Sequence, residues 1–144
     1  MPKDLTVSGV ERQNILNNPY ALEEIRKNVG IHTISYHGKT VLTKEQVADF
    51  FEISPRTIDN YLAQNEDELK QNGYEVLRGK ALQELKLAIS ESDVDEMYFA
   101  NIKKAPSLGI FDFRSFLNLG MLITESEKAK ILRQMVLDIV IDTI

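Results

Sequence analysis

The segment Thr43–Asn65, TKEQVADFFEISPRTIDNYLAQN, decides the fold that we predict for this chain. Thr43 and Gln46 stand at the spacing of a capping box, in which the hydroxyl accepts from a first-turn amide and the glutamine side chain bonds back to the cap. Ser54 followed by Pro55 is typical of a second helix start, because serine caps well and proline suits the first helical position. The segment therefore predicts two short helices joined by a tight turn.

The apolar residues of this segment follow the helical period and predict how the two helices pack. They are Val47, Ala48 and Phe51 in the first helix, Ile53 in the turn, and Ile58 and Leu62 in the second helix. A small residue such as Ala48 is expected where the helices cross. This pattern is typical of a DNA-binding helix-turn-helix, here over residues 43–65, whose second helix enters the major groove. Glu52 occupies the turn position where many such motifs have glycine, which predicts either backbone strain or a longer turn.

The second helix, residues 55–64, carries polar side chains that suit contacts with DNA bases. Arginine can pair with guanine and asparagine with adenine, and threonine can contact a thymine methyl group. We therefore predict that Arg56, Thr57 and Asn60 contact base edges. A second set is better placed for phosphate contacts, which position a protein without specifying sequence. That set is Lys44, Ser54, Tyr61 and Gln64.

The chain before this motif predicts two helices and a hairpin. Helical spacing of apolar residues indicates helices over 10–16 and 19–29. From Ile31 to Leu42 the period changes to two on either side of His37-Gly38, which predicts a β-hairpin with a tight turn.

The chain after the motif is expected to be mainly helical. We predict a loop or short helix over 64–73, a strand over 74–78, helices from 79 onward and over 97–104, a loop over 106–109, and a helix over 114–122. Thr124 and Glu127 match a second capping box, which predicts a last helix that runs to the end of the chain. Because only a narrow face of that helix is polar, we expect it to be buried nearly all round.

The predicted class is α+β, mostly α, with a helix-turn-helix that follows a β-hairpin and precedes a helical C-terminal region. The acidic stretch 90–96 predicts a boundary between an N-terminal region, 1–90, and a C-terminal region, 91–144. The apolar last helix ends without a residue that would cap its final carbonyls. We therefore expect it to form a homodimer interface, or to continue into a domain beyond residue 144.

Composition limits the possible functions. The chain of 144 residues has a formal charge of −5 and no cysteine, and residues 43–65 carry two basic and four acidic side chains. Nonspecific nucleic-acid binding is disfavoured, because phosphate neutralisation by basic residues supplies most of its affinity. The absence of cysteine excludes disulfides and thiolate sites and fits an intracellular compartment. No signal peptide or membrane-spanning run is present, so we expect a cytoplasmic protein with no membrane partner.

No pattern in the sequence indicates catalysis, a metal or a cofactor. His32 and His37 are predicted on opposite faces of the hairpin, which disfavours a shared metal ion. The acidic clusters at 66–68 and 91–96 lack the spacing of a calcium loop and are interpreted as solvated surfaces. Neither a nucleophile elbow nor a phosphate-binding loop is present. We therefore expect a binding protein and not an enzyme.

Two stretches resemble a known family. The run from His32 to Leu62, with KTVLTKEQVADFFEISPRTIDNYL followed by acidic residues, resembles the RhuM-type virulence-associated proteins. LNLGMLITESEKAKILRQMVLD, from Leu117 to Asp138, is similar to a segment of phage antirepressor-type proteins. These resemblances cover about half of the chain and imply a bacterial or phage-related regulator of transcription that binds double-stranded DNA.

Three other interpretations fit the same residues. The two helices can be an ordinary α-hairpin within a helical core. The motif can serve as a protein-interaction module whose acidic surface meets a basic partner. The chain can also be the non-catalytic N-terminal part of a larger toxin, nuclease or restriction-associated protein. The sequence specifies neither the DNA target nor whether binding would repress or activate.

Overall fold

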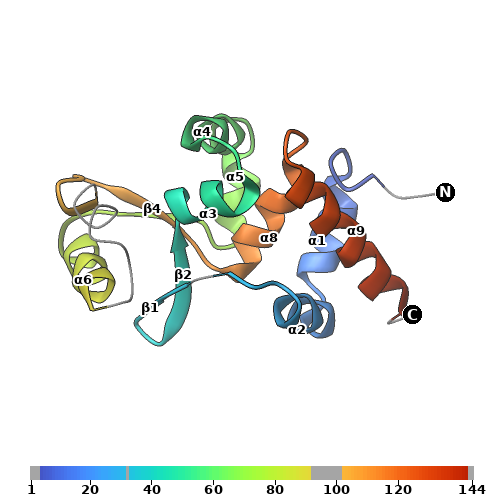
Figure 1. Cartoon of the computed structure of the whole chain (residues 1–144), viewed down its shortest axis with the longest axis horizontal. Helices are drawn as coiled ribbons and strands as arrows, with labels where there is room; N and C mark the ends of the chain where they lie inside the picture. The colour runs from blue at the N-terminus through green and yellow to red at the C-terminus, as the bar shows by residue number, and fades with distance from the viewer. Residues whose placement is uncertain (1–3, 32, 92–101, 143–144) are drawn as a thin grey trace.

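The computed structural model of the chain describes residues 4–31, 33–91 and 102–142, and Figure 1 shows how its elements are arranged. The elements are α1 (Gly9–Leu16), α2 (Pro19–Lys27), β1 (Ile34–Tyr36), β2 (Lys39–Thr43), α3 (Lys44–Phe51), α4 (Pro55–Gln64), α5 (Glu66–Gln71), β3 (Glu75–Leu77), α6 (Gly79–Ser90), β4 (Leu108–Phe111), α8 (Phe113–Leu122) and α9 (Glu127–Asp142). The protein is α+β and mostly helical, as the sequence predicted for its coarse class. Of the two alternatives for 64–73, the structure has the short helix α5.

The four strands within the described residues form one antiparallel sheet in the order β1-β2-β4-β3. The predicted hairpin is confirmed: β1 pairs with β2, and the turn residues His37 and Gly38 have φ values of 50° and 78°. Positive φ at both central residues is what a two-residue type I′ turn requires. The predicted loop over 106–109 is wrong at its end, because Leu108 and Gly109 pair with β3 as the start of β4.

Local capping signals explain where most helices begin. The capping box of Thr43 and Gln46 is present at α3, and Ser54 caps α4. A capping box that we did not predict starts α8, where the Asp112 side chain accepts from the Ser115 amide at 2.8 Å. The predicted box at Thr124 is wrong. Ser126 occupies the capping position of α9, and its hydroxyl accepts from the Ala129 amide at 3.1 Å.

The sheet separates two hydrophobic clusters, because neighbouring residues on a strand point to opposite faces. On β2, Val41 belongs to the smaller cluster and Leu42 to the larger; on β4, Ile110 and Phe111 divide in the same way. The smaller cluster lies between the sheet and α6, and the larger one lies among the remaining helices. Residues before and after the predicted boundary share both the sheet and the larger cluster. Most of the predicted 90–96 boundary and 97–104 helix lies outside the described residues.

Helix α9 is not buried all round, so that prediction is wrong for the single chain. Leu132 and Val136 are buried in the larger cluster, whereas Ile131 is 60% exposed. The reason is that α9 packs along one side, against α2, α3 and α8, and leaves its opposite side to solvent. No described helix is long and apolar enough to cross a membrane.

Candidate functional site

The segment of greatest interest is the pair of helices α3 and α4 with the turn between them. Glu52 closes α3 in the left-handed conformation, with φ 58° and ψ 42°, and the Ile53 amide donates to the Ala48 carbonyl at 3.1 Å. The structure therefore has a strained backbone at Glu52, which is one of the two outcomes that we expected, and not a longer turn. A left-handed conformation at a residue with a Cβ costs about 1–2 kcal/mol, so packing elsewhere must maintain this turn.

The inner faces of the two helices provide that packing. Ile58 of α4 is fully buried in one cluster with Val47, Ala48 and Phe51 of α3. The Phe51 ring also stacks on Phe116 of α8, with ring centroids 5.2 Å apart. The helix pair is thus fixed to the larger core through its apolar face, which leaves the other face of α4 outward.

Three of the predicted DNA-contacting residues lie on that outward face without a partner. Arg56, Asn60 and Gln64 are exposed, and none of them makes a hydrogen bond or ion pair with another described residue. The spacing of four residues places their side chains along one line of the helix surface. These side chains are therefore available to a ligand outside the protein.

Ser54 and Thr57 are occupied by the helix start itself. The Ser54 hydroxyl accepts from the Thr57 amide at 3.2 Å and lies 3.0 Å from the Thr57 hydroxyl. Both hydroxyls thus help to cap α4. The group of Thr57 that suits an outside ligand is its methyl group, whereas Ser54 mainly fixes the helix start.

Lys44 forms an ion pair that connects the two helices. Its ammonium nitrogen lies 3.0 Å and 3.2 Å from the two carboxylate oxygens of Asp59. The two side chains are 35% and 53% exposed, so the pair is accessible to water and contributes little to stability. Contact between Lys44 and an outside phosphate would require it to exchange this carboxylate for the new anion.

Tyr61 contacts the loop between α8 and α9. Its hydroxyl accepts from the Thr124 amide at 3.0 Å, lies 3.2 Å from the Thr124 hydroxyl and donates to the Glu125 carboxylate. The hydrogen bond from Tyr61 is the main cause that lowers the pKa of Glu125 below its usual 4.5, because it stabilises the carboxylate. Of the four residues predicted to contact phosphate, only Gln64 has no partner in the described chain.

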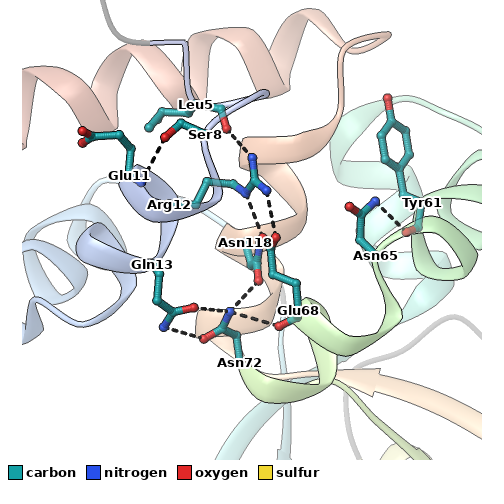
Figure 2. A network of polar contacts seen from close by, with 10 residues as sticks. All are labelled: Leu5, Ser8, Glu11, Arg12, Gln13, Tyr61, Asn65, Glu68, Asn72 and Asn118. Carbon is teal, nitrogen blue, oxygen red and sulfur yellow. Dashed lines mark hydrogen bonds and ion pairs between the residues drawn. The ribbon is translucent and has the colours of Figure 1, made fainter.

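A largely buried polar network lies between α1, α5 and α8, and the sequence did not reveal it (Figure 2). Arg12 of α1 donates to both carboxylate oxygens of Glu68 at 2.8 Å and to the Leu5 carbonyl at 2.7 Å. Asn118 of α8 donates to the same carboxylate at 2.6 Å, and Asn72 donates to Asn118 at 2.7 Å. The interpretation of 66–68 as a solvated surface is therefore wrong for Glu68.

This network is structural, because each charge in it is paired. The hydrogen bonds from Arg12 are the main cause that holds the pKa of Glu68 below its usual 4.5. Local sequence gave no signal for it, since Arg12 and Glu68 are far apart in the chain and each also fits an exposed helix position. Its effect is to fix α1, α5 and α8 relative to one another.

We also searched the other described residues for metal ligands, histidine contacts and pockets. No group of three or more potential metal ligands is found among the described residues. His37 lies 2.9 Å from the Glu84 carboxylate, and His32 is outside the described residues. A groove of about 460 Å³ between α2, β2 and the start of α8 is lined by Arg26, Lys39 and Glu23 among others. It contains none of the predicted site residues.

Comparison with family models, with curated proteins and with solved structures finds no match to this chain. The outward face of α4 is therefore interpreted from its own residues. Its exposed arginine and amide side chains lie on a helix that is anchored through Ile58, and they form a surface that can donate and accept hydrogen bonds.

Proposed function

We propose that α3 and α4 form a helix-turn-helix that binds double-stranded DNA in a sequence-specific way, with α4 in the major groove. The observation that carries this proposal is that Arg56, Asn60 and Gln64 are exposed and unpaired in the described chain, while Ile58 on the opposite side is fully buried. Arg56 would contact guanine and Asn60 adenine, and the Thr57 methyl would contact thymine. The proposal assigns no catalytic step to the protein.

The dimensions and polarity of α4 support this proposal. Its ten residues extend about 15 Å, and the helix is narrow enough to enter a major groove about 12 Å wide. The first turn contains no acidic residue, so the positive end of the helix dipole is not neutralised locally. In this turn the Arg56 amide is available to a phosphate, since Pro55 has no N–H and the amides of Thr57 and Ile58 donate to Ser54.

The net charge of the protein determines how its affinity for a specific DNA sequence should compare with its affinity for random DNA. With a net charge of −5, affinity for random DNA would be low, and most of the binding energy would come from base contacts. Lys44 would contribute to phosphate binding only after leaving Asp59. A high ratio of specific to nonspecific binding follows from this arrangement.

The same proposal includes a homodimer through α9. One short helix contacts few base pairs, and pairing two copies extends the recognised site. The side of α9 that carries Ile131 is open to solvent, so it is available to a second copy. A bacterial or phage-related regulator located in the cytoplasm would have this organisation.

A second candidate function is a protein-interaction module for a basic partner. It is favoured by the carboxylates of Asp59 and Glu125, which occupy Lys44 and Tyr61 at the edges of α4. In this case the exposed residues of α4 would contact a protein surface. Binding would then not depend on the sequence of a nucleic acid.

The test begins with selection of bound duplexes from a randomised pool, followed by fluorescence anisotropy titrations at several salt concentrations. We expect an enriched sequence, and losses of about 5- to 150-fold in affinity for it in Arg56→Ala and Asn60→Ala. Lys39→Ala, at the hairpin turn, is the matched control and should leave the affinity within about twofold. No enriched sequence, or equal effects of Arg56→Ala and Lys39→Ala, would reject DNA recognition. Binding of this protein to a basic protein partner would then favour the interaction module.

A further inference from the structure

The loop between α8 and α9, residues 123–126, contacts both helices of the proposed motif. We call it the α8–α9 loop. Its first contact is with α3: the Ser126 hydroxyl donates to the Phe51 carbonyl at 2.7 Å, in a buried position. The same hydroxyl accepts from the Ala129 amide and so begins α9. One side chain thus joins the end of α3, next to the strained Glu52, to the start of α9.

The second contact is with α4. Thr124 donates its amide to the Tyr61 hydroxyl, and that hydroxyl donates to the Glu125 carboxylate. A hydrogen bond to a charged acceptor is stronger than one between neutral groups. Tyr61 lies on the same helix as Arg56 and Asn60, so a contact at Tyr61 also restrains the direction in which those two side chains point.

The α8–α9 loop is itself held in place from within the protein. Arg133 of α9 donates to the carbonyls of Gly120 and Ile123, and the Ile123 side chain is fully buried. The loop can therefore act as a rigid support. By contrast, Ile58 is the one fully buried residue of α4, and the Lys44–Asp59 ion pair that joins α4 to α3 is accessible to water. Tyr61 and Leu62 are partly buried against the larger cluster, so the hydrogen bonds at Tyr61 add to the apolar contacts that hold α4.

We infer that the α8–α9 loop sets the orientation of α4 for DNA recognition, with Glu125 and Ser126 as positioning residues that do not themselves contact DNA. The effect on DNA recognition rests on the proposed function, whereas the support of α4 by the loop rests on the contacts of Thr124, Glu125 and Ser126. Base contacts need a fixed helix direction, whereas phosphate contacts tolerate small shifts. Loosening α4 would therefore reduce discrimination between sequences more than it reduces general affinity.

Loss of the Glu125 charge should tighten binding to DNA, whereas loss of its hydrogen bond to Tyr61 should weaken binding to the selected sequence. The direction of the change in affinity therefore tests the inference. Glu125→Gln removes a negative charge and keeps an acceptor for Tyr61, so binding to both specific and random duplexes should become up to about threefold tighter. Glu125→Ala removes the charge and the acceptor. It should bind random duplexes slightly more tightly and the selected sequence about tenfold more weakly.

The matched control is Glu127→Ala in the first turn of α9. Glu127 is exposed and has no partner among the described residues, so its replacement removes a nearby charge alone. Binding to both duplexes should become slightly tighter. If Glu125→Ala behaves like Glu127→Ala on both duplexes, charge explains the result and the positioning role is rejected.

Hydrogen exchange tests the mechanism without DNA. In Glu125→Ala, and in Ser126→Ala as a second variant, the amides of α4 should exchange at least about tenfold faster than in the wild type, while those of α6 stay unchanged. Unchanged protection of α4 in both variants would overturn the inference even if the protein binds DNA. Faster exchange in α4 together with no DNA binding by the wild type would instead reject the proposed function and leave the support of α4 by the loop established.

Discussion

The buried network around Glu68 allows a sharp test of what holds the helices together. Replacing Glu68 with alanine removes the only carboxylate that Arg12 contacts among the described residues. The Arg12 side chain is 8% exposed and the Glu68 side chain 26%. The variant would therefore leave a guanidinium group with little access to water, and it would also remove the acceptor of the Asn118 amide.

The expected loss of stability follows from these exposures. Removing one partner of a fully buried ion pair typically costs about 3–5 kcal/mol. Because Glu68 is partly exposed, water can enter once its side chain is gone and solvate part of the Arg12 charge. We therefore expect Glu68→Ala to lower the free energy of unfolding by about 2–4 kcal/mol. Glu68→Gln keeps one acceptor oxygen and should cost less than Glu68→Ala.

Urea denaturation followed by circular dichroism measures this difference. The control is Lys70→Ala, which removes the exposed pair with Glu66 on the same helix and should cost under about 0.5 kcal/mol. If Glu68→Ala costs no more than Lys70→Ala, the contacts of Glu68 with Arg12 and Asn118 do not stabilise the fold.

The pH dependence gives an independent check on Glu68. Its pKa in the folded state is held below the usual 4.5, mainly by the hydrogen bonds from Arg12. A carboxyl group with a lowered pKa contributes stability above its unfolded pKa, and this contribution disappears as the pH falls through the folded pKa. Wild-type protein should therefore lose more stability than Glu68→Ala as the pH falls below the usual 4.5 of a glutamate. Equal losses in the two proteins would contradict the assignment.

Three further predictions concern α8, the turn and α9. Gly120→Ala should lower the free energy of unfolding by about 1–3 kcal/mol in thermal denaturation, because a Cβ at this position would lie 2.9 Å from the Phe51 ring. Glu52→Gly should raise it by up to about 1 kcal/mol, because glycine adopts the left-handed conformation without strain; a loss instead would contradict strain at the turn. For the proposed dimer, Ile131→Glu should keep the fold and weaken self-association in sedimentation velocity, and self-association equal to that of the wild type would exclude this side of α9 as the interface.

Local signals in the sequence predicted most of the elements correctly. The capping residues Thr43 and Ser54, the His37-Gly38 turn and the helical period of apolar residues each act within a few residues of the chain. Such signals define where an element begins because the groups that satisfy the backbone are close in sequence. The α3–α4 pair was therefore predictable in outline.

The errors arose where a distant residue decided the structure. Leu108 is in a strand because β3 pairs with it, and no local pattern specifies that partner. Thr124 matches a helix cap, yet it contacts Tyr61, and Ser126 caps α9 while also bonding to α3. Glu68 lies in an acidic run but faces Arg12. In each case tertiary contacts override a reasonable local expectation.

The polar residues of the α3–α4 pair divide into two groups that sequence alone does not separate. Lys44, Ser54 and Tyr61 have partners within the protein, whereas Arg56 and Asn60 have none in its described part. A side chain that already has a partner is held by that contact, and using it for a ligand requires breaking the contact first. A side chain without one stays in water until a ligand arrives, so replacing it leaves the free energy of unfolding within about 0.5 kcal/mol. Recognition by α4 should therefore depend on the second group, while the first group keeps that helix in place.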